Sequence, residues 1–207
     1  MAKFIAGVEG TAPAADESPW RYGYGAFDDK AGRVFTFNSL THWTGSAWQT
    51  GPKLPDATHG WVVLMAEGGH PGRNPDHAVI RRWIAPRDGE VAITGLLRHP
   101  AKDGDGVRGR IVSSRSGVVG EWKVHNGQRE TAARVRVEKG DTIDFVVDCV
   151  TAEGFDSFFW SPTLRIDGAT WDAARDFSGP AAPVVRASRW EQLAQVLLLG
   201  NEFAFVD

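Results

Sequence analysis

Aromatic side chains set among turn-forming residues are the groups in this sequence best suited to contact a ligand. Trp20 and Tyr24 follow a proline in a glycine-rich stretch, and Trp43 and Trp48 flank Thr-Gly-Ser-Ala. Aromatics carried by loops on a rigid sheet more often meet a ligand than those inside alternating strands, and flat rings of this kind can stack on sugar faces. The alternative is that they cap the end of a hydrophobic core, because tryptophan is usually largely buried.

Polar side chains on and near the longest turn-rich segment, residues 68–77, could complete such a site. Three glycines and two prolines give this segment a defined path, and it carries His70, Arg73 and Asn74. With Lys53, these groups could bind sugar hydroxyls or sulfates. The alternative is an ordered connection between two sheets. The ligand site predicted from the sequence consists of Trp20, Tyr24, Trp43, Trp48, Lys53, His70, Arg73 and Asn74.

Signatures of catalytic or metal centres are missing from the sequence. Its six histidines occur without His-x-His or His-Glu-x-x-His spacing, and Cys-x-x-Cys and Gly-x-Ser-x-Gly are absent. Glycoside cleavage needs two carboxylates at a fixed distance, which a sequence does not give. Asp103-Gly104-Asp105-Gly106 resembles half of a calcium loop, but Arg108 and Arg110 follow it, so we expect a hairpin turn. We predict no cofactor, and a structural calcium held by distant residues stays open.

Composition fits one globular domain with an appendage. The chain has 207 residues, of which 42% are hydrophobic and 24% charged, and its net charge of −3 does not indicate nucleic-acid binding. The single cysteine, Cys149, lies in a strand-like setting and is expected to be a buried small hydrophobe. Neither a signal peptide nor a membrane span is recognisable.

Alternating patterns between residues 33 and 166 predict strands. Turn residues separate them at 87–89, 102–106, 125–127 and 139–141. Because no helical pattern lies between the strands, the fold class predicted is all-β: an antiparallel, jelly-roll-like β-sandwich. One face of successive strands supplies the predicted core, which is Val91, Ile93, Leu97, Ile111, Val135, Val137, Ile143, Phe145 and Val147.

The last residues change in character. Residues 179–187 are rich in proline and alanine and read as a linker between a sandwich module at 1–178 and a tail at 188–207. Ser188 and Glu191 have the spacing of a capping box, and apolar residues follow at helical spacing, so a helix is predicted over 189–199. Its apolar face is expected to pack on the sandwich or on another body.

Several motifs together resemble a known family. Gly60-Trp61-Val62-Val63-Leu64, Gly69-His70-Pro71-Gly72 and the segments 78–83, 104–107 and 140–148 are similar to a non-catalytic β-sandwich of large planctomycete surface proteins. Those proteins join a cytochrome c-like domain to two domains of unknown function. The resemblance covers about residues 18 to 168, and residues 188–207 resemble the C-terminus of the last of those domains. The cytochrome portion and most of that last domain are missing, so the chain is expected to be an excised or rearranged fragment.

The resemblance implies carbohydrate binding and export to the periplasm or cell surface, but it supplies no agreed list of binding residues. We therefore expect a carbohydrate-binding module that holds a polysaccharide without cleaving it. Lys53 and Arg73, with Arg81 or Arg82, would favour an anionic or sulfated glycan. The first alternative is an assembly module that docks other domains of a parent protein through the C-terminal helix, and the remote alternative is a polysaccharide lyase or hydrolase.

Overall fold

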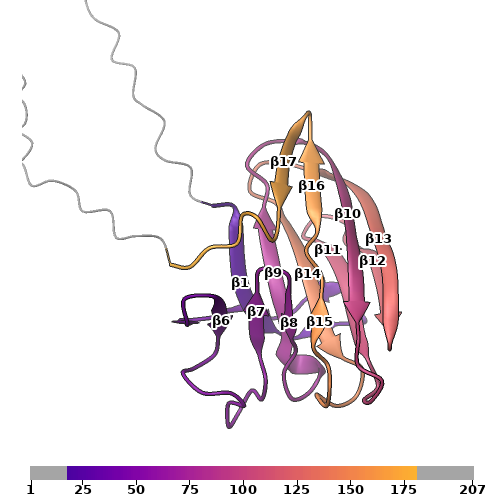
Figure 1. Ribbon diagram of the computed structural model, residues 1–207. Coiled ribbons are helices and arrows are strands. Elements are labelled where there is room, and N and C mark those ends of the chain that lie inside the picture. Colours follow the sequence, from indigo (N-terminus) through magenta and orange to yellow (C-terminus); the bar gives the residue numbers. More distant parts are fainter. Residues whose placement is uncertain (1–17, 181–207) are drawn as a thin grey trace, which may run out of the picture.

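The computed structural model describes residues 18–180, and these form two large β-sheets and a small two-stranded one made by β2 (Phe27–Asp28) and β3 (Arg33–Val34) (Figure 1). The predicted linker from residue 181 onward and the predicted helix at 189–199 lie outside the described residues. Within residues 18–180 no helix has the length and apolar character that crossing a membrane requires.

Every strand pairing is antiparallel, as the sequence predicted. A six-stranded sheet has the order β12 (Gly117–Val124), β11 (Val107–Ser113), β14 (Thr142–Cys149), β9 (Ala78–Ile84), β1 (Trp20–Gly25) and β4 (Asn38–Ser39). A nine-stranded sheet has the order β17 (Ala169–Asp172), β16 (Thr163–Ile166), β10 (Gly89–His99), β15 (Phe158–Phe159), β8 (Gly68–His70), β7 (Val63–Met65), β6 (Ala47–Gln49) and β5 (His42–Trp43), with β13 (Gly127–Val137) also paired to β10. The short elements are β2 (Phe27–Asp28), β3 (Arg33–Val34) and the single-turn η1 (Pro75–His77).

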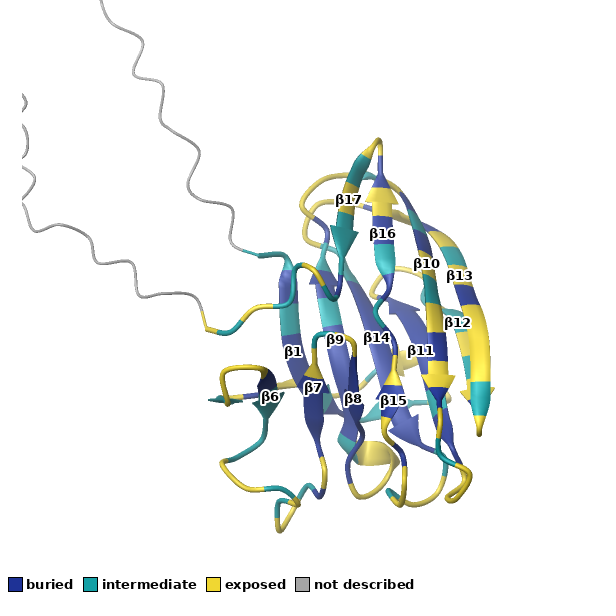
Figure 2. Ribbon diagram, in the orientation of Figure 1, coloured by how far each residue is buried: buried dark blue, intermediate teal, exposed yellow. Residues whose placement is uncertain are grey.

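The hydrophobic core lies between the two sheets. Strand residues alternate between buried and exposed along β10 and β13, as Figure 2 shows, because successive side chains point to opposite faces. All nine residues predicted for the core are buried, so the predicted register is confirmed. Cys149 is likewise buried and unbonded.

The outward face of the six-stranded sheet is covered by the chain between β1 and β4. Ala78, Ile80, Val112 and Val146 form a second apolar cluster there, and Phe27, Val34 and Phe37 pack against it. Arg82 on this face donates to both carboxylate oxygens of Asp144, at 2.7 and 2.8 Å, and lies 4.0 Å from the centre of the Phe37 ring. Arg82 is therefore paired within the protein, whereas the prediction offered it as one of two alternative cations for an anionic glycan.

Arg81 points the other way, into the space between the sheets, and is only 2% exposed. Its guanidinium donates hydrogen bonds to the carbonyl oxygens of Met65, Ala66 and Ala173, at 2.7, 3.1 and 2.6 Å. Burial lowers the pKa of Arg81 to about 10, and the nearby Tyr22 and Asp172 partly offset this. Arg81 thus joins β9 to the β7–β8 turn and to the segment after β17, which overturns its predicted role at the surface.

Replacing this guanidinium tests how much the sandwich depends on it. We expect Arg81→Met to lower the free energy of unfolding by about 2–5 kcal/mol, because one buried and two partly buried carbonyl groups lose their donor. Urea denaturation followed by fluorescence would measure the change. The exposed Arg136→Met is the matched control and should alter stability by less than about 0.5 kcal/mol. Equal stability of the two variants would contradict a structural role for Arg81.

Candidate functional site: an aromatic and arginine row on the open sheet face

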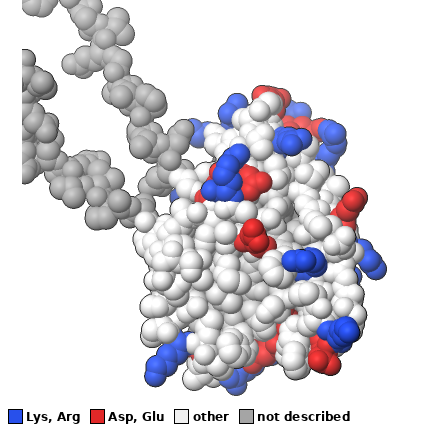
Figure 3. Space-filling model, in the orientation of Figure 1, with Lys and Arg blue, Asp and Glu red and all other residues white. Residues whose placement is uncertain are grey.

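The β2–β3 segment covers the outward face of the six-stranded sheet, whereas the outward face of the nine-stranded sheet is left open. Because Ile93 and Leu97 on β10 enter the core, Leu96 and Arg98 point outward from the same strand. This face is turned toward the viewer in Figure 3, where a wide uncharged area extends over β6, β7, β8 and β15. A rigid, open and largely uncharged sheet face can support an extended ligand.

Strand register places five residues in one transverse row, which we call the sheet-face row: Arg98, Phe159, Gly68, Met65 and Ala47. Phe159 pairs with Arg98 on one side and with Gly68 on the other. Met65 follows Leu64, the partner of Gly69, and pairs with Ala47. Because directly paired residues share a face, the row runs from β10 across β15, β8 and β7 to β6.

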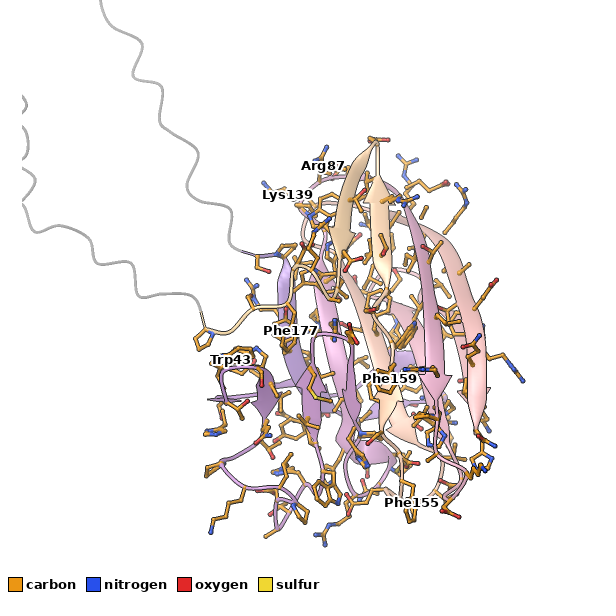
Figure 4. The ribbon with its side chains drawn as sticks, in the orientation of Figure 1. Trp43, Arg87, Lys139, Phe155, Phe159 and Phe177 are labelled. Carbon is orange, nitrogen blue, oxygen red and sulfur yellow. The ribbon has the colours of Figure 1, made fainter. Side chains whose placement is uncertain are left out.

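Phe159 is the exposed aromatic ring of the row (Figure 4). It is 36% exposed, and the Arg98 guanidinium lies 4.3 Å from the centre of its ring. This cation–π contact holds a flat apolar surface beside a cation with five N–H donors. Met65, 43% exposed, adds a second apolar contact beyond Gly68.

Gly68 sets the position of Phe159. A Cβ atom at Gly68 would collide with the carbonyl oxygen of Phe158. Glycine therefore allows β8 and β15 to approach closely enough to pair, and it leaves no side chain between Phe159 and Met65. The surface of the sheet-face row is consequently depressed at Gly68, between the side chains of Phe159 and Met65.

The predicted aromatic residues lie elsewhere. Trp20 is 2% exposed and packs in the core, 6.2 Å from the Phe145 ring, so it presents no face to a ligand. Trp43 and Trp48 are half-buried and contact each other, with ring centres 5.2 Å apart. They are inward-facing because Trp48 pairs with the core residue Leu64.

Residues 177–179 pass over these two tryptophans, and we call this segment the strap. Phe177 lies 5.7 Å from Trp43 and 4.7 Å from Tyr22, measured between ring centres. The Trp48 indole N–H donates to the Ser178 carbonyl oxygen at 2.8 Å, and a Cβ atom on Gly179 would collide with the Trp43 ring. The strap therefore occupies part of the aromatic surface that the sequence assigned to a ligand.

The remaining predicted residues lie on or beside loops and are not part of the sheet-face row. Tyr24 O–H lies 3.2 Å from His59 Nε2, and the other ring nitrogen of His59 lies 2.8 Å from Asp56. His70 is buried, and its Nδ1 is 2.6 Å from the Pro71 carbonyl oxygen. Burial also lowers the pKa of His70, so the ring is suited to a neutral, structural role.

Three of the predicted polar groups are exposed: Lys53, Arg73 and Asn74. The Asn74 side chain accepts from the backbone N–H of Asp76 at 3.0 Å and caps η1. Its role in the structure is thus to shape the 70–77 loop. Neither these groups nor Tyr24 are brought together with Trp43 and Trp48 by any ring contact or hydrogen bond of the described residues.

Several exposed apolar side chains were not singled out from the sequence: Phe159, Met65, Trp61 and Phe155. A signal for Phe159 was present, because two consecutive phenylalanines in a strand must point to opposite faces and Phe158 is the buried one. Phe155 is 62% exposed and has φ of 69°, an uncommon conformation for a bulky residue. Nothing in the local sequence indicates that conformation.

Asp156 follows Phe155 and has an unusual environment. Its carboxylate is fully buried, and neither oxygen has a hydrogen-bond partner among the described residues. His99 Nε2 is 3.7 Å away and faces the Phe155 carbonyl oxygen at 2.9 Å. Burial raises the pKa of Asp156 to about 7, and repulsion from Asp105 and Glu153 adds to the effect.

The segment that resembles half of a calcium loop lies at the β10–β11 connection. Asp103-Gly104-Asp105-Gly106 connects β10 to β11, with left-handed backbone at both glycines. Among residues 18–180, no three His, Cys, Asp or Glu side chains are arranged to hold a metal ion.

Comparison with known proteins gives little beyond these observations. No protein-family description matches the chain, and no curated protein matches it. Among solved structures, it is similar to a family 35 carbohydrate-binding module from Clostridium thermocellum, at 13% identity and a TM-score of 0.30. That similarity covers 60% of this chain and 89% of the other.

The strap contacts predict that Trp48 stabilises the fold. We expect Trp48→Ala to lower the free energy of unfolding by about 2–4 kcal/mol, because the variant loses ring packing and the hydrogen bond to Ser178. The control is Trp61→Ala, whose ring is 43% exposed, and it should cost clearly less in the same urea titration. If Trp48→Ala left the free energy of unfolding unchanged, a structural role for this ring would be contradicted and a role in ligand contact would be favoured.

Asp156 predicts a specific pH dependence of stability. Its folded pKa lies above the ordinary value, so the native state binds more protons than the unfolded state between roughly pH 4 and pH 7. This group therefore favours folding at low pH, and its contribution is lost as the pH rises toward 7. Asp156→Asn should show a smaller loss of stability than the wild type between about pH 5 and pH 8, measured by urea denaturation. Parallel pH profiles would refute the raised pKa.

Proposed function

We propose that this chain is a non-catalytic module that binds a polysaccharide along the sheet-face row. The observation that carries the proposal is the exposed Phe159 ring with the Arg98 guanidinium beside it. Sugar rings have an apolar C–H face and hydroxyl groups around the edge. An aromatic ring suits the first, and the N–H donors of arginine suit the second.

The shape of the site favours a chain over a small molecule. Small-molecule sites are usually concave and enclose most of their ligand. The cavity between the sheets near Arg81 and Phe145 has a volume of only about 10 Å³, which leaves no room for a sugar. The exposed side chains of the sheet-face row instead belong to β10, β15 and β7, so they offer contacts to more than one unit of a polymer.

The ligand is proposed to be an anionic glycan bound outside the cytoplasm. A sulfated or otherwise anionic glycan is supported by Arg98, and Lys53 and Arg73 remain exposed on loops. Export to the periplasm or cell surface rests on the family resemblance. The rival assembly function is supported by Phe35, which is 74% exposed beyond the six-stranded sheet and could contact another domain.

Affinity electrophoresis with a panel of polysaccharides would test the proposal. We expect at least one polysaccharide to retard the wild-type protein, and Phe159→Ala to abolish most of that retardation. Removing one stacked ring should weaken binding by about fivefold to tenfold. The melting temperature should change little, because Phe159 is partly exposed and fills no core space.

Phe35→Ala is the matched control, because it removes an exposed phenylalanine from the opposite side of the molecule. It should leave glycan binding unchanged. If Phe35→Ala weakened binding and Phe159→Ala did not, the ligand would lie on the other side of the sandwich. Absence of retardation by any polysaccharide would favour the assembly function, and release of new sugar ends would indicate an enzyme.

A further inference from the structure

A shallow depression of about 330 Å³ lies on the same outward sheet face, farther along β10. It is lined by Ala92, Ile93, Thr94, Ala132, Ala133 and Arg134. Ala92, Thr94 and Ala132 point outward, whereas the side chains of Ile93 and Ala133 are directed to the core side of the sheet. These small side chains leave the backbone surface open to a ligand group.

Two arginines flank the floor of the depression. Ala92 pairs with Arg134 on β13 and with Arg165 on β16. Paired residues share a face, so both guanidinium side chains leave the sheet on the same side as Ala92. Their Cα atoms are two strand spacings apart, which is about 10 Å. The next row of the floor, at Thr94, has the short side chains Ala132 and Thr163 on either side.

Neither arginine is committed to a buried carboxylate. Arg134 contacts Glu90 at 3.2 Å, but the two side chains are 75% and 65% exposed, so the pair is weak and exchangeable. Arg165 is exposed and forms no ion pair with another residue of the described segment. Arg110 on the opposite sheet differs, because it is fully buried and bound to Asp148.

The acidic groups near the depression do not fill it. Glu130 pairs with Leu96, one row farther along β10. Asp172 lies beyond Thr163 and accepts hydrogen bonds from Thr163 Oγ1 and from the backbone N–H groups of Ala174 and Arg175. Asp172 is therefore already satisfied within its turn, and the two arginines are the cations closest to the floor.

We propose that this depression binds an anionic substituent, a sulfate ester or a carboxylate, of the same polysaccharide. The inference rests on the proposed function and names the class of glycan. Arginine matches the oxygens of such groups with paired N–H donors. Outward residues connect the depression to the sheet-face row, because Leu96 and Arg98 follow Ala92 and Thr94 along β10. Ala92 and Arg98 are six residues apart, or about 20 Å, so only an oligomeric ligand reaches both.

A sulfated polysaccharide and its desulfated form would test the inference by affinity electrophoresis. We expect the double variant Arg134→Gln/Arg165→Gln to bind the sulfated form about fivefold to thirtyfold more weakly than the wild type. Its binding to the desulfated form should be unchanged. Added salt should reduce the wild-type preference for the sulfated form, because exposed charges are screened.

The control is Lys30→Gln/Arg33→Gln, which also removes two exposed positive charges but from the β2–β3 segment that covers the six-stranded sheet. It should bind both polysaccharides as the wild type does. If this control lost the preference for sulfate, or if the double variant kept it, the anion site would not be the depression. Either result would leave polysaccharide binding itself intact.

A second measurement separates this inference from the proposed function. A sulfated disaccharide added to ¹⁵N-labelled protein should shift the amide resonances of Ala92, Thr94 and Ala132, and the unsulfated disaccharide should not. Such shifts would support the anion site even if every polysaccharide failed to retard the protein, whereas that failure would overturn the proposed function. Absence of shifts with the sulfated probe would overturn the anion site.

Discussion

The buried cation Arg81 joins three segments of the sandwich that lie far apart in the sequence. Its guanidinium has no carboxylate within ion-pair distance in the described segment, and three carbonyl oxygens solvate it instead. Such an arrangement is stable only if the carbonyl groups stay in place, because a buried charge without partners is costly. The β7–β8 turn and the residue Ala173 are thereby held against β9, and the Phe177 ring lies 5.5 Å from the same guanidinium.

The need of charged groups for partners also distinguishes the outward faces of the two sheets. The six-stranded sheet carries Arg82, Asp144 and Arg110 on its outward side, and the β2–β3 segment must cover them with phenylalanine rings and ion pairs. The nine-stranded sheet carries alanine, threonine, leucine and exposed arginine on its outward side and needs no cover. The two sheets therefore differ in what they offer to solvent, and the proposed ligand site lies on the second.

The sequence was sufficient for the class of fold and for the core. Alternation identified nine buried residues from Val91 to Val147, because strand periodicity is a local property. The aromatic residues were harder. Glycine and serine around Trp43 correctly indicate a tight turn, but nothing near residue 43 shows that residues 177–179 cover it. Alternation along β9 places Arg81 on the same inward face as Val79 and Trp83. Arg81 was nevertheless predicted to be a surface cation, because arginine is rarely buried.

The candidate site could not be predicted from the sequence for a related reason. Arg98, Phe159, Gly68 and Met65 belong to four strands, and their alignment depends on pairing between segments up to about ninety residues apart. The arginine pair around Ala92 has the same origin, since Arg134 and Arg165 become neighbours only through β10. Single side chains could be assigned to faces from sequence, but cross-strand neighbours could not.

The strap has a mechanical consequence. Residues 177–179 hold to the edge near β5 and β6 by ring contacts and by the two hydrogen bonds of Ser178, to Trp48 and Tyr22. Tension applied to the chain at residue 180 would load these few contacts one after another, as in peeling, before it reached the long β16–β10–β13 ladder. The strap would thus detach at a lower force than the sheet that presents Phe159, which would keep its shape.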